Sequence, residues 1–457
     1  MLQSKPVLTI YISNMSEDVW PFISAMSSPY DREVEIQENA KLSEHDLFSF
    51  IGIDNLLMIV PRYPDKIYLK YFRDSFAGKN FRILSTQVHT GEICKDILKD
   101  KEIMGEIKKI CHGYKKVHLI SYCCSTQFLE LSKMLKKTIP SIVLTESPEF
   151  SDSWTVDFYG SKSGIRQLSQ MHGAHEPDFR MAEGLISVGI ANSVKIAANM
   201  YTKNGGIVVK TNKGHSGAGV LIFRPRDLPL DFTSCEKAIY PYLDKERYWR
   251  QFPIILEKYI EPYYPIGGGY PNVEFRIHKN GRIEFLYYCA CRLTDQGVFK
   301  GIIIHNDVLS DKVAAQIVDT GFFIAEQYAK HGYRGYFDVD FIAGRNGDLY
   351  VSESNTRRTG GTHVYYTAQK LFGKDFMYET YAISNNTQKT PKSVTLGSED
   401  LFKLLATILF TKKRMEGIVI TGTSLLDQRA FGYIIFAKNK TKALKFERRM
   451  SELLGFY

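Results

Sequence analysis

The chain has 457 residues, of which 44% are hydrophobic, 13% aromatic and 24% charged, and its formal net charge is +9. This length exceeds one ordinary core, so two or three domains are expected, and the composition excludes a disordered or low-complexity chain. The lysines and arginines are spread along the sequence, which argues against nucleic-acid binding and leaves an acidic ligand or partner open.

The first 150 residues alternate short apolar runs with amphipathic segments, a pattern that predicts a parallel α/β layer. Buried strands are expected at 7–13, 56–61, 66–72, 117–123 and 141–146, and helices at 94–111 and 125–139. None of these strands is followed by a G-x-G-x-x-G loop, so a dinucleotide site is unsupported. We therefore interpret this region as a structural or partner-binding domain.

Targeting signals and cysteines indicate a cytoplasmic protein. The start, MLQSKPVLTIYISNM, lacks the regions of a signal peptide, and the apolar stretch 401–410, an expected buried helix, is too short to span a membrane. Seven cysteines without a signal sequence suggest reduced thiols. Cys123, Cys124, Cys289 and Cys291 lie in strand-like apolar context, so core thiols are favoured over a zinc site.

A polar, turn-rich stretch at 147–164 marks the first domain boundary. Beyond it the pattern changes to antiparallel strand pairs, which predicts an α+β region. Helices are expected at 163–174 and 311–332, and strand pairs at 205–225, 273–293 and 335–355, the last two with Asn-Gly turns.

The strand pair at 205–225 carries a glycine loop, GHSGAG, directly after a strand that ends near Lys210. Rossmann and Walker A loops both enter a helix, so neither fits this strand-loop-strand setting. Successive backbone N–H groups can still form an anion-binding nest, with Lys210 supplying a positive charge. A plain flexible turn is the open alternative. The loop residues of such a phosphate site are Gly214, His215, Ser216, Gly217 and Gly219.

Polar residues interrupt the hairpin at 335–355 in a coordinated way. Asp340 lies on one strand, and Glu353 and Asn355 share one face of the next. Hard oxygen ligands of this kind suit Mg²⁺, together with phosphate oxygens of a substrate. Arg357 and Arg358 follow, and their guanidinium groups suit a transferring phosphoryl group or an oxyanion. A solvated hairpin with ordinary surface charges is the alternative.

Between these two features lies the strand IILEKYIEP at 254–262. Beside a phosphate loop and a magnesium hairpin, this segment is interpreted as the one that hydrogen-bonds an adenine edge through its backbone. Glu261 is then placed for the ribose. The segment comprises Glu257, Lys258, Tyr259, Ile260 and Glu261.

The order of lysine, glycine loop, Glu-Lys-Tyr-Ile segment and Asp…Glu-x-Asn hairpin resembles the ATP-grasp superfamily over about residues 160–370. The resemblance implies ATP and Mg²⁺ as cofactors. It implies that Lys162 and Lys210 hold the phosphates. It also implies that Arg357 and Lys210 are the catalytic residues. The magnesium ligands would be Asp340, Glu353 and Asn355, although the family often has Glu at the first position and Asp338 competes for the role.

A narrower likeness involves both ends of the chain. Residues 1–150 resemble the pre-ATP-grasp domain of stand-alone peptide ligases of the pheganomycin type, and 416–454 is similar to their C-terminal segment. A related ligase of butirosin-type biosynthesis loads an amino acid onto an acyl-carrier protein. The implied fold is a Rossmann-like pre-ATP-grasp layer, then a two-lobed ATP-grasp domain and a C-terminal extension. The expected ranges are 1–150, 151–375 (small lobe about 160–260, large lobe about 261–375) and 376–457.

The resemblance implies a ligase that activates a carboxylate as an acylphosphate and joins it to an amine of an amino acid or peptide, in specialised (antibiotic) metabolism. Loading of an acidic acyl-carrier protein and a non-catalytic ATP-binding protein are the alternatives. Arg276, Arg292 and Arg358 are candidates to clamp the substrate carboxylate, although structural ion pairs explain such arginines equally well. Expected partners are small molecules, without nucleic acid or membrane, and a homodimer stays open.

Overall fold

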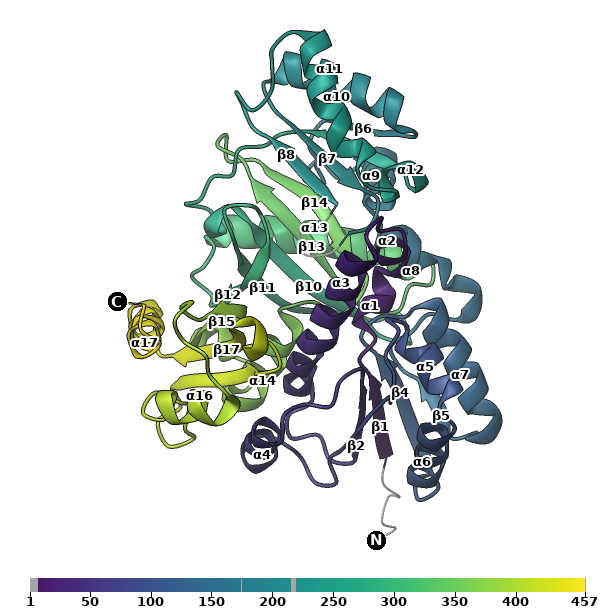
Figure 1. The fold of residues 1–457 in the computed structure, drawn as a ribbon, viewed down its shortest axis with the longest axis vertical. Helices are drawn as coiled ribbons and strands as arrows, with labels where there is room; N and C mark the ends of the chain where they lie inside the picture. Colours follow the sequence, from purple (N-terminus) through teal and green to yellow (C-terminus); the bar gives the residue numbers. More distant parts are fainter. Residues whose placement is uncertain (1–6, 174, 215–218, 457) are drawn as a thin grey trace.

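The computed structural model describes residues 7–173, 175–214 and 219–456. Over these residues the strands form a five-stranded parallel sheet and two antiparallel sheets of four and eight strands. Figure 1 shows the four-stranded sheet at the top and the parallel sheet at the lower right, with the eight-stranded sheet running from the middle to the lower left. The expected combination of an α/β layer with an α+β region is confirmed.

The N-terminal sheet is parallel and buried on both faces. Its strands, in spatial order, are β3 (Arg82–Ser85), β2 (Leu56–Val60), β1 (Val7–Ile12), β4 (Lys116–Ser121) and β5 (Ile142–Leu144). Helices cover both faces, which is why the strands are nearly continuous apolar runs. The helical elements between residues 7 and 160 are α1 (Met15–Asp18), α2 (Trp20–Ser24), α3 (Pro29–Leu42), η1 (Ser43–Phe50), α4 (Lys66–Ser75), α5 (Ile93–Lys99), α6 (Lys101–Cys111), α7 (Thr126–Thr138), η2 (Phe150–Asp152) and α8 (Trp154–Tyr159), and the last of these packs against the large sheet.

The strand expected at 66–72 is wrong, because this segment forms helix α4. Asp65 caps the helix by accepting hydrogen bonds from the backbone N–H groups of Ile67 and Tyr68. Tyr68 and Phe72, one turn apart, are both fully buried. The edge strand of the sheet is instead β3, which the sequence pattern missed. A short apolar run is compatible with both the strand and the helix periodicity. Here the capping residue Asp65 favours the helix.

We call the four-stranded sheet and its helices the small lobe. Its strands, in spatial order, are β6 (Gly184–Ser187), β9 (Ile254–Lys258), β7 (Ile207–Thr211) and β8 (Val220–Phe223). Its helices are α9 (Lys162–His172), α10 (Ile190–Asn204), α11 (Phe232–Asp244) and α12 (Tyr248–Gln251). The hairpin of β7 and β8 is the strand pair expected around the glycine loop.

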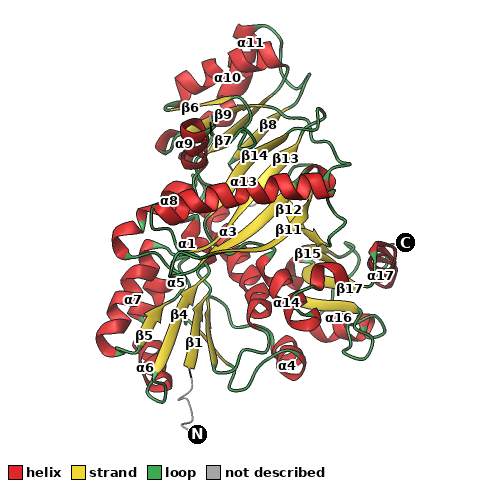
Figure 2. Cartoon of the chain, turned by 180° about the vertical axis from the view of Figure 1, so that it is seen from behind, coloured by secondary structure: helices red, strands yellow, loops and turns green. Residues whose placement is uncertain are grey.

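The eight-stranded large sheet is antiparallel throughout. In spatial order it contains β14 (Leu349–Asn355), β13 (Gly335–Ala343), β10 (Pro271–Ile277), β11 (Ile283–Leu293), β12 (Phe299–Ile304), β15 (Tyr381–Lys389), β17 (Ala430–Ala437) and β16 (Gly417–Gly422). Helix α13 (Asp311–Lys330) crosses one face (Figure 2). The segment expected as an extension therefore supplies three strands to this sheet. The remaining helical elements are η3 (Gly267–Gly269), α14 (Thr362–Phe372), α15 (Phe376–Glu379), α16 (Ser398–Leu405), η4 (Leu426–Gln428) and α17 (Lys440–Leu453).

The helix expected over 401–410 ends early, because α16 stops at Leu405. The Phe410 N–H donates to the Ile418 carbonyl at 2.8 Å, and the Ile418 N–H donates to the Ile408 carbonyl at 2.9 Å. The backbone of 408–410 thus runs beside β16, whose edge offers the partners that a helix would otherwise provide. Within the described residues, none of the helices combines the length and apolar character needed to cross a bilayer.

Contacts far apart in sequence join the N-terminal domain to strand β16. Glu44 of η1 accepts hydrogen bonds from the backbone N–H groups of Thr423 and Ser424, at 2.7 and 2.9 Å. The Tyr68 hydroxyl donates to the Thr421 carbonyl at 2.6 Å. One hydrophobic core contains residues of η1, α4, β11, α14 and β17 together. The N-terminal domain and the far half of the large sheet are therefore one packed unit.

Candidate active site

Helix α9 carries two basic side chains, of which Lys162 meets the large sheet and Arg166 meets the four-stranded sheet. Ser161 caps the helix by accepting a hydrogen bond from the Gly164 N–H at 3.0 Å. Lys162 and Arg166 are one turn apart and therefore lie on one face. The Lys162 Nζ atom lies 2.7 Å from the Glu353 Oε2 atom of β14, so this ion pair joins the small lobe to the large sheet.

Lys210, the lysine before the glycine loop, is buried in a second group of charges. Its Nζ atom lies 2.8 Å from Glu257 Oε2 and donates to the Ser352 hydroxyl at 3.1 Å. Arg166 lies 2.6 Å from the other carboxylate oxygen of Glu257. Burial opposes ionisation of Glu257, but Lys210 and Arg166 outweigh it and hold the pKa of this carboxyl below its ordinary value.

Three strands bring the predicted metal ligands together with two further residues. In the sheet register Asp340 of β13 lies opposite Glu353, and Asp338 lies opposite Asn355, both on β14. The Asn272 amide of β10 donates to Asp338 at 3.0 Å and to Asp340 at 2.8 Å. The Asn355 amide also donates to both carboxylates, at 3.0 and 3.2 Å. Both candidates for the first metal position therefore face the same point.

The pKa values of two carboxyl groups in this cluster are shifted in opposite directions. Burial, and then repulsion from Asp338 and Glu353, raises the pKa of Asp340 well above its ordinary value. Glu353 differs: burial opposes its ionisation, but Lys162 and Lys210 outweigh burial and lower its pKa to about 2. The part of the chain that the structure describes has no cluster of three or more His, Cys, Asp or Glu side chains spaced to enclose a metal ion. The donor set fits Mg²⁺, which takes one or two carboxylates and completes its shell with phosphate oxygens.

Arg357 is held by the N-terminal domain. Its Nε atom lies 2.8 Å from an Asp18 carboxylate oxygen, and its Nη1 atom donates to the Tyr122 hydroxyl at 3.3 Å. The Nη2 atom donates to the Asn355 side-chain oxygen at 3.0 Å. Asp18 and Tyr122 follow β1 and β4, neighbouring parallel strands whose carboxyl ends form the usual crevice for ligands. The sequence analysis missed Asp18 and Tyr122, although their positions after two predicted parallel strands could have indicated them.

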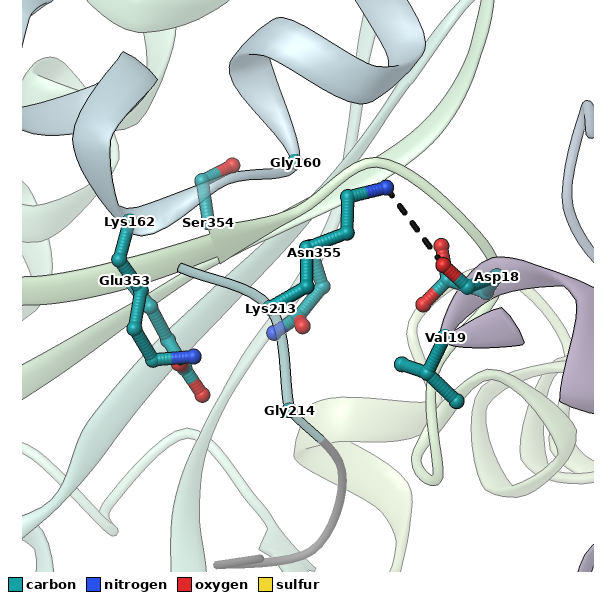
Figure 3. Close-up of a pocket in the computed structure, with 9 residues that line it drawn as sticks. All are labelled: Asp18, Val19, Gly160, Lys162, Lys213, Gly214, Glu353, Ser354 and Asn355. Carbon is teal, nitrogen blue, oxygen red and sulfur yellow. Dashed lines mark hydrogen bonds and ion pairs between the residues drawn. The ribbon is translucent and has the colours of Figure 1, made fainter. Parts of the chain in front are cut away.

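A small cleft lies where the N-terminal domain meets both lobes (Figure 3). Lys213, which the sequence analysis also missed, extends into it from the segment after β7. The Lys213 Nζ atom lies 2.8 Å from Asp157 and donates to the Asp18 carbonyl at 3.5 Å. The cleft is lined by Asp18, Val19, Gly160, Lys162, Lys213, Gly214, Glu353, Ser354 and Asn355.

The glycine loop is described only at its ends. The Thr211 N–H donates to the Gly219 carbonyl at 2.8 Å, and Gly219 has a φ of +77°. A Cβ on Gly219 would lie 2.3 Å from a Thr211 side-chain carbon and 3.1 Å from the Phe22 ring, so glycine is required there. The predicted phosphate-loop residues outside the described residues are His215, Ser216 and Gly217.

The predicted adenine segment, residues 257–261, leads from β9 toward the large sheet. The Lys258 N–H donates to the Glu183 carbonyl at 2.8 Å, which ties the start of the segment to the small lobe. Glu261 is exposed and lies 2.7 Å from Arg345 in the β13–β14 turn. The segment thus crosses between the lobes, with Tyr259 and Ile260 in the middle.

The three arginines proposed for the substrate separate into two places. Arg276 and Arg358 share Glu146, at 2.9 and 2.6 Å, beside the end of β5. Arg358 is 2% exposed. Arg292 instead lies 2.7 Å from Glu447 of α17, in the C-terminal part of the molecule. The structure therefore groups two of the three candidates around one carboxylate, that of Glu146.

The cysteines pack as thiols. Cys289 is buried and Cys291 is partly exposed on β11, and their sulfur atoms lie 3.7 Å from Asn272 and 4.0 Å from Asp340. Burial raises the pKa of Cys289. All seven cysteines are free.

Glu274, beside the acidic cluster, should make stability depend on pH. Burial, reinforced by Asp338 and opposed by hydrogen bonds from Tyr287, Thr359 and Thr362, raises its pKa from 4.5 to about 7. Its contribution is thus fully present below pH 4.5 and is lost as pH rises through 7. Relative to Glu274→Gln, the wild-type free energy of unfolding should fall by about 3 kcal/mol from pH 4 to pH 8. Urea unfolding at both pH values tests this, and equal pH dependence of the two proteins would contradict it.

The small lobe facing a large antiparallel sheet, with a parallel layer before them, is the ATP-grasp fold. Among solved structures, the biotin carboxylase of Campylobacter jejuni, in a complex with β-γ-ATP, has a TM-score of 0.55 at 14% identity, covering 96% of this chain and 89% of that chain. N5-carboxyaminoimidazole synthase from Aspergillus clavatus, in complex with ADP and 5-aminoimidazole ribonucleotide, has a TM-score of 0.55 at 10% identity, covering 98% and 99%.

A third similar structure is the biotin carboxylase domain of 2-oxoglutarate carboxylase from Hydrogenobacter thermophilus, in complex with MgADP, ADP and bicarbonate. Its TM-score is 0.53 at 16% identity, covering 97% of this chain and 89% of that chain. No protein-family model matches the sequence, and no curated protein matches it. The likeness to these enzymes is therefore one of fold.

Proposed function

We propose that this protein is an ATP-dependent ligase that activates a carboxylate as an acylphosphate and joins it to an amine of an amino acid or peptide. One observation carries the proposal: Lys162, Lys210 and Arg357 converge on the oxygen ligands around Glu353, where the two lobes meet. The similar structures support it, because they contain ATP-type nucleotides or ADP.

The side chains fit Mg-ATP in number and type. Lys162 and Lys210 would hold the phosphates, and residues 257–261 would hold the adenine and ribose. Asp340, Glu353 and Asn355 would hold the metal. Asp338 lies beside them and accepts hydrogen bonds from the Asn272 and Asn355 amides. Lys213, at the edge of the cleft, adds a further cation for the phosphate chain.

Bound Mg-ATP would supply the γ-phosphoryl group that converts the carboxylate into an acylphosphate, from which an amine displaces phosphate. The protein would contribute positioning and charge rather than a covalent nucleophile. Arg357, fixed by Asp18 and Tyr122, would stabilise negative charge on the transferring group. Arg276 and Arg358 would hold the substrate carboxylate, since together with Glu146 they carry one net positive charge.

The proposal is tested by trapping the activated acid. The protein is mixed with Mg-ATP, hydroxylamine and a panel of amino acids, peptides and other carboxylic acids, and phosphate and hydroxamate are measured together. We expect both products, in equal amounts, with the acid that the enzyme uses. Omission of ATP is the control.

Other outcomes of this screen support the alternatives. Phosphate release that requires an acyl-carrier protein, with a thioester on its phosphopantetheine arm, would support carrier loading, which the +9 charge favours for an acidic partner. Tight ATP binding without phosphate release across the panel would support a non-catalytic protein and contradict the ligase.

A further inference from the structure

Arg166 and Lys210 flank the Glu257 carboxylate, one at each oxygen, and Arg166 does not line the cleft. It is 4% exposed, and its Nη2 atom lies 2.6 Å from Glu257 Oε1 and donates to the Ala182 carbonyl at 2.9 Å. Its Nη1 atom donates to the Gly184 carbonyl at 3.4 Å. The guanidinium group is therefore fixed by one carboxylate and two backbone carbonyls, a geometry that suits its planar fork of donors.

The backbone leaves room for this arrangement at Gly184. A Cβ there would lie 2.4 Å from the Leu256 carbonyl oxygen, 3.1 Å from the Glu257 side chain and 3.2 Å from the Arg166 guanidinium carbon. Any other residue would clash with the Leu256 carbonyl and crowd both Glu257 and Arg166. The contact between them thus depends on a glycine in the neighbouring strand.

The net charge of Lys210, Glu257 and Arg166 together determines how strongly Lys210 can attract an anionic ligand. Lys210 and Glu257, 2.8 Å apart, would form a neutral pair by themselves. With Arg166 on the other carboxylate oxygen, the three side chains carry one net positive charge. Lys162 needs no second basic residue on its partner Glu353, because Glu353 belongs to the predicted metal site and a bound cation would balance its charge.

We propose that Arg166 is a positioning residue for ATP binding: it neutralises Glu257 at the other carboxylate oxygen, so that Lys210 is held in place and keeps an uncompensated positive charge for the phosphates. This inference rests on the proposed function. It assigns to Glu257 a structural role as the shared counter-ion, in addition to its place in the adenine segment.

Four variants test the charge argument through the dissociation constant for Mg-ATP. Arg166→Met and Arg166→Gln leave Lys210 neutralised by Glu257, so we expect binding to weaken by about tenfold or more, as for the loss of one close charge. Arg166→Lys keeps the charge but loses the fork of donors, so it should bind Mg-ATP more tightly than either neutral variant and more weakly than wild type. The double variant Arg166→Met/Glu257→Gln restores the net charge and should recover most of the affinity lost in Arg166→Met.

The double variant separates charge from structure, because a merely structural role for Arg166 predicts further loss when Glu257 is also changed. Arg166→Gln retains a hydrogen-bond donor and replaces Arg166→Met if that variant does not fold, with thermal unfolding as the check. Arg180→Met, which removes an exposed ion pair with Asp348, is the matched control and should bind normally.

Two results would overturn the inference alone. One is wild-type affinity in both neutral variants, and the other is a folded double variant that binds as weakly as the single one. If instead wild-type protein does not bind Mg-ATP, the proposed function itself fails, so the two failures are distinguishable.

Discussion

Replacing Glu353 with glutamine is expected to lower ATP-dependent phosphate release by about a thousandfold, because charge stabilisation through a bound metal is worth several kcal/mol and each 1.4 kcal/mol is tenfold in rate. Glu353 faces Asp340 across the hairpin and pairs with Lys162. A neutral amide lacks the negative charge that would balance both the metal ion and Lys162. The measurement is phosphate release with the acid identified by the hydroxylamine trap.

The control for this variant lies in the same sheet. Glu284 of β11 also pairs with a base, at 2.6 Å from His278, but belongs to no part of the proposed site. Glu284→Gln should therefore retain full turnover. Thermal unfolding separates lost chemistry from lost structure, and full turnover in folded Glu353→Gln would remove Glu353 from the site.

Replacing Arg357 with methionine or lysine is expected to reduce turnover by about 10³-fold or more, the effect of losing an arginine that stabilises phosphoryl transfer. Lysine should not restore it, because Asp18, Tyr122 and Asn355 bind three different nitrogens of the guanidinium group. Tyr122→Phe removes one of these contacts and should cost about tenfold at most.

Two results for the Arg357 and Tyr122 variants would contradict this prediction. Arg357→Lys with turnover within about tenfold of wild type would mean that the guanidinium geometry is not used. Equal losses in Tyr122→Phe and Arg357→Met would instead indicate that the N-terminal domain, rather than the arginine, determines the rate. Single-turnover measurements with saturating Mg-ATP distinguish these cases from weaker nucleotide binding.

The fold class could be predicted from the sequence because its signals are local. Continuous apolar runs separated by amphipathic segments predicted the parallel layer, and Asn-Gly turns predicted the β10–β11 and β13–β14 hairpins. The same local evidence failed at 66–72, where a short apolar run suits both strand and helix. It also gave no warning that β15 pairs with β12.

The same distinction between local and long-range contacts applies to the candidate site. Asp340, Glu353 and Asn355 could be grouped from the sequence because a hairpin places them on facing strands. Asp18 meets Arg357 across 339 positions of the chain, and no periodicity reports such a contact. Arg292 shows the converse: its strand position resembled that of Arg276, but its partner Glu447 comes from a distant helix.

The bonding of Glu44 to Thr423 and Ser424 has a consequence for biosynthesis. Thr423 is translated 379 codons after Glu44, so during synthesis the apolar surface of the N-terminal domain that β17 later covers must be shielded by other means. Contacts of such long range fold slowly and leave partly folded chains prone to aggregate. We therefore expect the nascent chain to depend on chaperones until residues 417–437 have left the ribosome, and premature termination before β16 to yield insoluble protein rather than a smaller active one.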